Sequence, residues 1–152
     1  SVRNCPFCDV SQEKGFGIVY QDSDYVTFLD YAPAAQHHLL VIPRRHIGAS
    51  SSVISENASL VSDMKRIGTA QLDKLDIPTD NRLMGFHIPP FNSVDHLHLH
   101  VFGLPWNSFM QRDKYPVKEG SGNHDKGWSW FVEIDQAIRI LEKGSQVTVT
   151  PC

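Results

Sequence analysis

The sequence HLHLHVF at positions 96–102 carries three histidines at alternate positions, with apolar residues between them. On a β-strand alternate side chains lie on one face, so His96, His98 and His100 are predicted to point the same way, about 6.6 Å apart. The apolar residues between them take the opposite face and are expected to anchor the strand in the core. We therefore predict a rigid strand that displays three imidazoles toward one ligand.

Two kinds of chemistry suit such a strand. An imidazole with an ordinary pKa near about 6.5 is largely neutral at pH 7 and can act as a nucleophile, while a protonated neighbour can neutralise phosphate charge. A His-x-His pair on a strand is equally typical of a metal site. Three histidines in strict alternation favour a functional role over simple packing, but their spacing alone does not decide between nucleophilic catalysis and metal ligation.

The composition predicts one soluble domain over residues 1–152. The chain is 41% hydrophobic, and no apolar run approaches the roughly 20 residues that span a bilayer, so no membrane partner is expected. A formal net charge of -3 argues against a surface that tracks phosphates, and nucleic acid is therefore not an expected partner. Three cysteines do not make a secreted disulfide framework, which favours the cytoplasm, the nucleus or both.

The pattern of apolar residues around the histidines favours an α+β fold with an antiparallel sheet of about five strands. Five stretches rich in apolar, β-branched and aromatic residues are predicted strands: residues 17–21, 25–30, 38–42, 82–87 and 94–102. The turn at residues 22–24 predicts a hairpin between the first two strands. The loop at residues 88–93, stiffened by two prolines, leads into the histidine strand and is well placed to hold a ligand.

Two helices are predicted from the spacing of apolar residues. One long helix covers residues 55–74, with Ser55 as its N-cap, and a C-terminal helix covers residues 135–143, with Asp135 as its N-cap and Gly144 just past its end. Residues 105–127 contain Gly, Lys and Asp without a sustained period, so they are predicted to form a long, mobile surface loop.

These segments resemble the histidine-triad (HIT) family, and the similarity extends from Cys5 to about Val149. The motif HLHLHVF looks like the family signature, FLD at 28–30 like its nucleotide-binding strand end, and LVIPRRHI at 40–47 like its basic turn. RLMGFH at 82–87 and PPF at 89–91 look closest to the third Hint branch, with some likeness to the aprataxin catalytic domain. The resemblance implies a HIT-like sheet and hydrolysis of purine nucleoside 5′-phosphoramidates, of the adenosine 5′-monophosphoramidase type, through a nucleotidyl-histidine.

The resemblance also implies a role for particular residues. His98 is the expected nucleophile, His100 supports the phosphate, and Ser93 donates to the phosphate or the leaving group. Gly85 departs from the Asn that some Hint proteins carry there, so a phosphate contact by that Asn is not expected here. The residues expected to bind the nucleotide are Phe7, Val10, Phe28, Leu29, Asp30, Asn92, Ser93, His98 and His100, with Asp30 accepting hydrogen bonds from the ribose hydroxyls.

Cys5 and Cys8 have the C-x-x-C spacing of a metal-binding pair and need two more ligands for a closed tetrahedral site. His46 and His96 are the candidates, since several HIT relatives turn the first triad histidine toward zinc. The four predict a structural Zn²⁺ that leaves His98 free, whereas the reaction itself is expected to need no Mg²⁺. The alternative is a pair of free thiols on an N-terminal arm.

Two other functions stay open at this point. One is an aprataxin-like DNA-adenylate hydrolase, although such proteins carry a C-terminal zinc finger that the residues after Gly144 cannot form. The other is a nucleotide-binding regulatory protein with residual turnover. The resemblance further implies AMP or GMP derivatives as ligands and a homodimer as the assembly.

Overall fold

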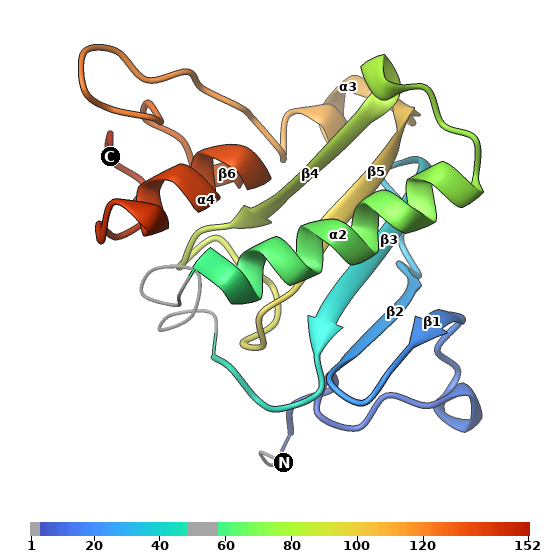
Figure 1. Ribbon diagram of the computed structural model, residues 1–152. Helices are drawn as coiled ribbons and strands as arrows, with labels where there is room; N and C mark the ends of the chain where they lie inside the picture. The colour runs from blue at the N-terminus through green and yellow to red at the C-terminus, as the bar shows by residue number, and fades with distance from the viewer. Residues whose placement is uncertain (1–3, 49–57) are drawn as a thin grey trace.

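An antiparallel sheet of six strands forms the centre of the computed structural model, which describes residues 4–48 and 58–152 (Figure 1). The strand order across the sheet is β1-β2-β3-β5-β4-β6. The strands are β1 (Ile18–Gln21), β2 (Tyr25–Leu29), β3 (Ala35–Pro43), β4 (Arg82–His87), β5 (Leu99–Trp106) and β6 (Phe131–Glu133). The α+β class and the antiparallel sheet are confirmed, and β6 is one strand more than the sequence predicted.

The hairpin of β1 and β2 is closed by Asp22, whose carboxylate accepts hydrogen bonds from the backbone N–H groups of Asp24 and Tyr25. This side chain therefore mimics a backbone turn, as Asp residues commonly do between strands. β3 is longer than the apolar run that predicted it, because residues 35–37 pair with the far end of β5.

The prediction that a strand begins at residue 94 is wrong, since β5 begins at Leu99. The backbone at residues 93–96 is bent, and the N–H of Leu97 donates to the carbonyl of Ile47 at 2.7 Å, outside the sheet ladder. His96 therefore precedes the sheet, which lets its side chain turn away from those of His98 and His100.

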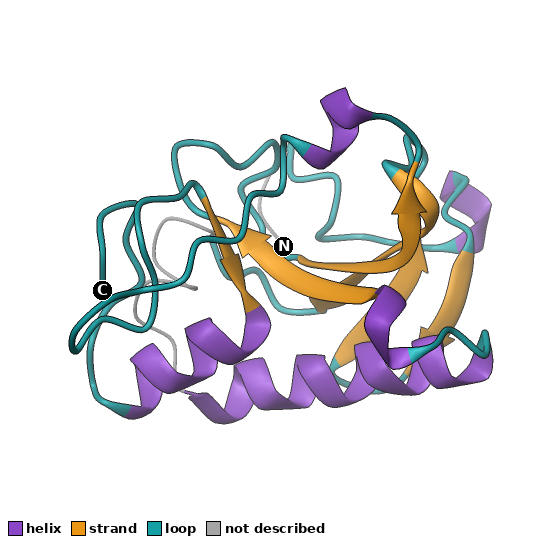
Figure 2. Cartoon of the chain, turned by 90° about the horizontal axis from the view of Figure 1, so that it is seen from above, coloured by secondary structure: helices purple, strands orange, loops and turns teal. Residues whose placement is uncertain are grey.

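Two helices, α2 (Ala58–Lys74) and α4 (Ile134–Glu142), cover one face of the sheet (Figure 2). The predicted N-cap Ser55 lies outside the described residues. The N-cap of α4 is Glu133 and not Asp135: the Glu133 carboxylate accepts from the N–H groups of Asp135 and Gln136 in a capping box. Gly144 follows the helix with φ of 74°, the left-handed conformation that ends many helices.

The main core lies between these helices and the sheet. Val61, Met64 and Ile67 of α2 are buried against Val41 and Val101 of the central strands. Two smaller apolar clusters lie on the opposite face of the sheet, one around Phe28 and one around Phe102. These side chains alternate along their strands with those that face the main core. This second face is open between the two clusters, and it carries the site described below.

Residues 105–127 are more ordered than the predicted loop. They contain the one-turn helix α3 (Phe109–Arg112) and an antiparallel bridge between Glu119 and Lys126. Lys126 is fully buried, and its ammonium donates to the carbonyls of Gly127, Thr148 and Val149. These bonds tie the C-terminal segment to the end of the loop. Two short 3₁₀ helices, η1 (Gln12–Lys14) and η2 (Thr79–Asn81), complete the regular structure of the described residues.

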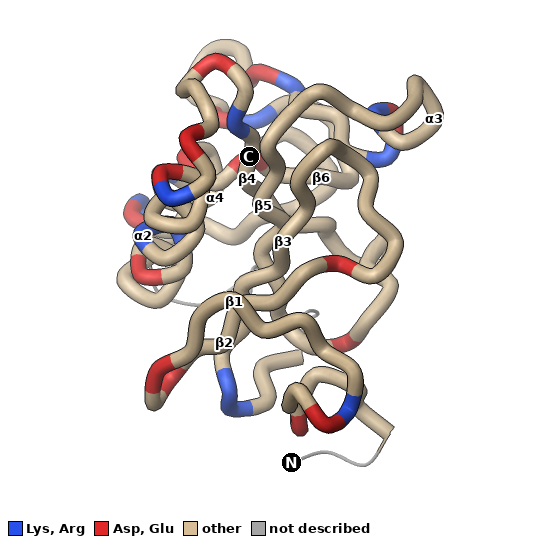
Figure 3. The backbone as a smooth tube through the Cα atoms, turned by 90° about the vertical axis from the view of Figure 1, so that its right-hand side faces the viewer, with Lys and Arg blue, Asp and Glu red and all other residues tan. Residues whose placement is uncertain are grey.

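Within residues 4–48 and 58–152, no helix has the length and apolar character that crossing a membrane requires. Lysine and arginine alternate with aspartate and glutamate along α2, α4 and the loops, and the central strands carry few charges (Figure 3). Basic and acidic positions are therefore interspersed along the backbone.

Candidate active site

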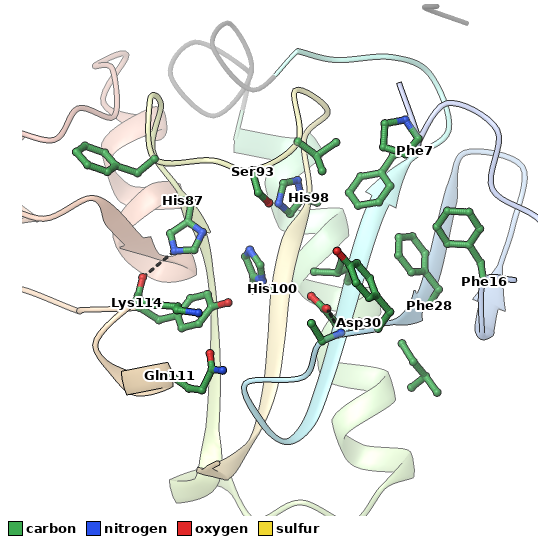
Figure 4. Close-up of a pocket in the computed structure, with 18 of the residues that line it drawn as sticks. Phe7, Phe16, Phe28, Asp30, His87, Ser93, His98, His100, Gln111 and Lys114 are labelled. Carbon is green, nitrogen blue, oxygen red and sulfur yellow. Dashed lines mark hydrogen bonds between the residues drawn. The ribbon is translucent and has the colours of Figure 1, made fainter. Parts of the chain in front are cut away.

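A pocket of about 950 Å³ opens on the face of the sheet opposite α2 and α4 (Figure 4). Its floor follows one row of cross-strand partners, because Phe28 pairs with Leu40, Leu40 with His100, and His100 with Gly85. Side chains in such a row share a face of the sheet. The pocket therefore lies across four strands, with His98 and His100 near its middle.

His98 is buried at the pocket wall, immediately before β5, with 6% of its surface exposed. Its Nδ1 lies 2.6 Å from the backbone carbonyl oxygen of His96, which can only accept, so Nδ1 carries the proton. Burial lowers the pKa of His98 to about 4, and the ring is neutral at pH 7. The lone pair is thus on Nε2, which is the form that a nucleophilic imidazole requires.

The tautomer of His100 is set by a chain of hydrogen bonds that begins at the backbone. The N–H of Ala34 donates to Nδ1 of His38 at 3.0 Å, so the proton of neutral His38 is on Nε2. That Nε2 donates to Nδ1 of His100 at 2.9 Å, which places the proton of neutral His100 on its own Nε2. Burial lowers the pKa of His38 to about 3 and that of His100 well below its ordinary value, so both rings are neutral.

The Nε2 of His100 is buried and has no hydrogen-bond partner among the described residues. A buried donor without a partner costs free energy, of the order of 1–3 kcal/mol, and such groups commonly await a ligand. His100 lines the pocket beside His98, with their ring centroids 5.1 Å apart. The pair therefore offers a bound group one lone pair and one N–H donor.

His96 does not share this pocket, and the prediction that all three imidazoles face one ligand is wrong. Its Nε2 donates to the carbonyl of Pro43 at 2.8 Å, which leaves the lone pair on Nδ1, 3.4 Å from the thiol of Cys5. His46 Nδ1 lies 3.2 Å from the thiol of Cys8. The ligand atoms of Cys5, Cys8, His46 and His96 all lie within 4.8 Å of one another.

This donor set fits zinc. Two thiolates and two imidazoles complete a tetrahedral structural site, and a ligating histidine usually donates its other N–H to a carbonyl, as His96 does to Pro43. The structure therefore brings together the four residues that the sequence selected.

The cysteine pair also positions Phe7, which lies between the two thiols in the sequence. The ring of Phe7 packs edge-on against His98, with centroids 5.5 Å apart, and against Phe28 at 5.4 Å. Phe16 extends this aromatic cluster at 4.9 Å from Phe28. A metal held by Cys5 and Cys8 would thus fix one apolar wall of the pocket.

The remaining predicted residues divide into two groups. Leu29, Asp30 and Ser93 line the pocket with Phe7 and Phe28, and burial raises the pKa of the Asp30 carboxyl. Val10 and Asn92 do not line it. Val10 packs against the cluster around Phe28, and the side-chain amide of Asn92 donates to the carbonyl of Val94, closing the turn before the histidines.

Reasoning from the sequence missed several residues of the pocket. His38 acts on it through His100, and His87 lines it with its Nε2 donating to the carbonyl of Lys114 at 2.7 Å. The ring of His87 stacks on Tyr115, whose pKa burial raises to about 12. The sequence did offer one signal for His87. It lies two residues after Gly85, the position where some Hint proteins carry an Asn expected to contact phosphate, so the two residues share a face of β4.

Gly85 is required by what packs over it. A β-carbon added there would overlap the carbonyl of Val132 and the ring of Phe131, which lies beneath His87. We expect Gly85→Ala to lower the free energy of unfolding by about 3 kcal/mol, the upper part of the range for overpacking, because backbone cannot move aside cheaply.

Urea unfolding of both proteins measures this. Gly17→Ala is the control, because its added carbon would meet only Leu29 at 3.4 Å, an ordinary contact. An unchanged urea midpoint for Gly85→Ala would show that the Phe131 packing is not what excludes a side chain.

Comparison with known proteins shows which family the chain belongs to. Residues 4–115 match the family model described as "Scavenger mRNA decapping enzyme C-term binding". The chain is 33% identical over 143 residues to adenosine 5'-monophosphoramidase HINT3 of Xenopus tropicalis, an alignment that covers 91% of this chain and 88% of that protein. A HIT family hydrolase from Clostridium thermocellum superposes with a TM-score of 0.59 at 26% identity, covering 69% of this chain and 94% of that one.

The aprataxin ortholog Hnt3, solved in complex with DNA, superposes with a TM-score of 0.58 over 86% of this chain and 70% of its own. At 23% identity, this likeness shows a shared fold and no more. The family model and the Hint relative cover most of the chain, and they show that the chain belongs to the histidine-triad family and resembles its Hint branch.

Proposed function

We propose that this protein is a nucleoside phosphoramidase that hydrolyses purine nucleoside 5′-phosphoramidates, derivatives of AMP or GMP, through a nucleotidyl intermediate on His98. One observation carries the proposal: a neutral imidazole with its lone pair on Nε2 lies beside a buried, unpartnered N–H donor of His100 in one pocket. A nucleophile and a donor 5.1 Å apart, centroid to centroid, suit the two sides of a phosphoryl group.

In the first step, Nε2 of His98 attacks the α-phosphorus. A bond from nitrogen to phosphorus forms, the bond from phosphorus to the amine breaks, and the amine leaves as a neutral amine after taking one proton from solvent water. The His98 ring becomes positively charged as it takes up the phosphoryl group, and the carbonyl of His96 stabilises that charge through Nδ1–H. The N–H of His100 and the hydroxyl of Ser93 donate to the phosphoryl oxygens, where negative charge gathers.

In the second step, water attacks the same phosphorus on the face that the amine has left. The bond to Nε2 breaks, one proton of the attacking water returns to solvent, nucleoside monophosphate is released and neutral His98 is restored. No residue changes its tautomer over the cycle, because His96 and His38 hold the Nδ1 atoms of His98 and His100 in fixed roles. Protein groups stabilise each charge that develops on the phosphoryl group and on His98. Because no metal ion is needed for this, we expect added Mg²⁺ to leave the rate unchanged.

The nucleoside is proposed to bind at the end of the pocket that holds Phe7, Phe16, Phe28 and Asp30 (Figure 4). Aromatic rings at this end offer apolar walls to a flat base, and the Asp30 carboxylate can accept hydrogen bonds from ribose hydroxyls. Zinc bound by Cys5, Cys8, His46 and His96 would hold the segment that carries Phe7, and it would take no part in bond making.

The experiment compares two substrates and measures the binding of AMP. Adenosine 5′-phosphoramidate should be hydrolysed to AMP, with or without MgCl₂, and much faster than a DNA end that carries a 5′-adenylate. Faster turnover of adenylated DNA would favour the aprataxin-like function. Tight AMP binding with turnover no faster than that of the His98→Ala variant would favour a nucleotide-binding regulatory protein.

A further inference from the structure

A second cavity, of about 560 Å³, lies where the end of α2 meets the start of β3 (Figure 1). Its volume is within the range of about 300–1,000 Å³ that small-molecule sites occupy. The cavity adjoins the catalytic pocket, because Leu29 and Asp30 line both. Leu39 and the residues of α2 in its lining place it on the helix-covered side of the sheet, and the reaction proposed above does not use it.

Gln71 lines this second cavity with a buried side-chain amide. It is only 7% exposed, and the other buried residues of α2 carry no polar side chain. Its amide forms no hydrogen bond with any group of the described residues. Buried polar side chains are nearly always paired, so an amide left without a partner at a cavity wall points to a bound ligand. It offers that ligand two N–H donors and one carbonyl acceptor.

The charges around the cavity favour an anionic group. Lys74 follows Gln71 by three residues, so both side chains lie on the same side of α2, and Lys74 forms no ion pair within the described part of the chain. Asp30 is the acidic residue of the lining, but its carboxylate accepts the N–H of Ala32 at 2.9 Å and lies 3.4 Å from Nε2 of His38. The carboxylate is therefore engaged, while the ammonium of Lys74 is available.

The apolar part of the lining is aliphatic. Val19, Leu29 and Leu75 are 38%, 52% and 41% exposed, so each keeps apolar surface that a ligand could cover. None of the described residues that line this cavity is Phe, Tyr or Trp, and a flat base would find no ring to stack on. An aliphatic chain would gain free energy by removing these side chains from water.

We propose that this cavity binds a small aliphatic monocarboxylate, with its carboxylate held by Lys74 and Gln71 and its chain packed against Val19, Leu29 and Leu75. The ammonium and the amide N–H both donate to the carboxylate, and such charge-assisted hydrogen bonds are stronger than neutral ones. Lys74 is the one Lys or Arg among the described lining residues, so a single carboxylate matches the cavity better than a polyphosphate.

The test measures the binding of sodium octanoate to the full chain by calorimetry and by NMR titration. Octanoate should bind about tenfold more tightly than butanoate, because its four further methylenes are partly buried against the aliphatic walls. It should also bind about tenfold more tightly than octylammonium, which presents a cation to Lys74. The backbone amide resonances of Gln71 and Leu75 should shift during the titration, which locates the ligand at the end of α2.

Two substitutions test how the carboxylate is recognised. Gln71→Glu keeps the shape of the side chain, removes its N–H donors and adds a like charge, so it should weaken octanoate binding at least about tenfold. Lys74→Glu reverses the charge of an exposed side chain and should weaken binding about fivefold. Lys118→Glu is the matched control, because it makes the same charge change at an exposed lysine outside both cavities; its affinity should equal that of the parent.

Equal affinities for octanoate and butanoate, or for octanoate and octylammonium, would overturn the carboxylate site. An octanoate affinity that both variants retain would also overturn it, because the ligand would then lie elsewhere, for example in the catalytic pocket. An equal loss in Lys118→Glu would show an effect of net charge and no site. Melting temperatures identify a misfolded Gln71→Glu, and Lys74→Glu then decides alone. None of these measurements involves turnover, so a failure here leaves the proposed phosphoramidase standing.

Discussion

His98→Ala should lose the covalent intermediate and lower kcat by at least about 10³-fold, the scale expected when the atom that forms the bond is removed. The nucleoside monophosphate should still bind, because Phe28 and Asp30 at the other end of the pocket are unchanged. Single-turnover kinetics with radiolabelled adenosine phosphoramidate measure the chemical step, and AMP titration measures binding. His124→Ala is the control, since His124 is exposed on the loop and should leave both values near those of the parent.

His100→Ala should fail differently from His98→Ala. Removing the N–H donor weakens the stabilisation of phosphoryl charge but keeps the attacking nitrogen, so label should still be trapped, only more slowly. Label trapped on His98→Ala as readily as on the parent would show that another group is the nucleophile. Equal trapping rates for His100→Ala and the parent would remove His100 from the phosphate site.

If the site holds zinc, its loss should destabilise the fold about as much as the Gly85→Ala substitution. If the site holds zinc at 100 times its dissociation constant, binding contributes about 2.7 kcal/mol to folding, and tighter binding contributes more. Cys5→Ser should therefore lose the metal and melt at a lower temperature. Because Phe7 contacts His98 and follows Cys5 by two residues, the variant should also raise KM more than it lowers kcat.

Elemental analysis, thermal melting and steady-state kinetics measure these three effects on freshly purified protein. Cys152→Ser is the matched control, because that thiol lies outside the cluster and bonds to the backbone of Thr148. It should keep about one zinc per chain, as a closed four-ligand site requires. Absence of zinc from the parent, or an unchanged metal content and melting temperature in Cys5→Ser, would favour the alternative of two free thiols.

The strands with a clear apolar pattern were predictable from the sequence, and those without one were not. β4 was predicted to the residue, because Arg82–His87 is a run bounded by polar residues and proline. β6 was missed because three residues are too few to show a period, and only pairing with β4 makes Phe131–Glu133 a strand. The N-cap of α4 was misplaced by two residues because Asp135 and Glu133 are both acidic and only the fold selects between them.

The site was predictable in composition but not in orientation. Alternation placed all three histidines on one face, yet the contacts that turn His96 aside come from Cys5 and Cys8, about ninety residues earlier in the chain. No local pattern carries such a contact. His38 was missed for a related reason, since a single histidine in an apolar strand becomes informative only when the fold places it beside His100.

The most direct test of the account is to locate the nucleotide on the protein. Intact-mass spectrometry after a brief quench with adenosine 5′-phosphoramidate, followed by peptide mapping, should show one adenylyl group, attached to His98. An adenylyl group on His96 or His100, or turnover with no adduct at any quench time in the parent and in the His100→Ala variant, would contradict the assignment of His98 as the nucleophile.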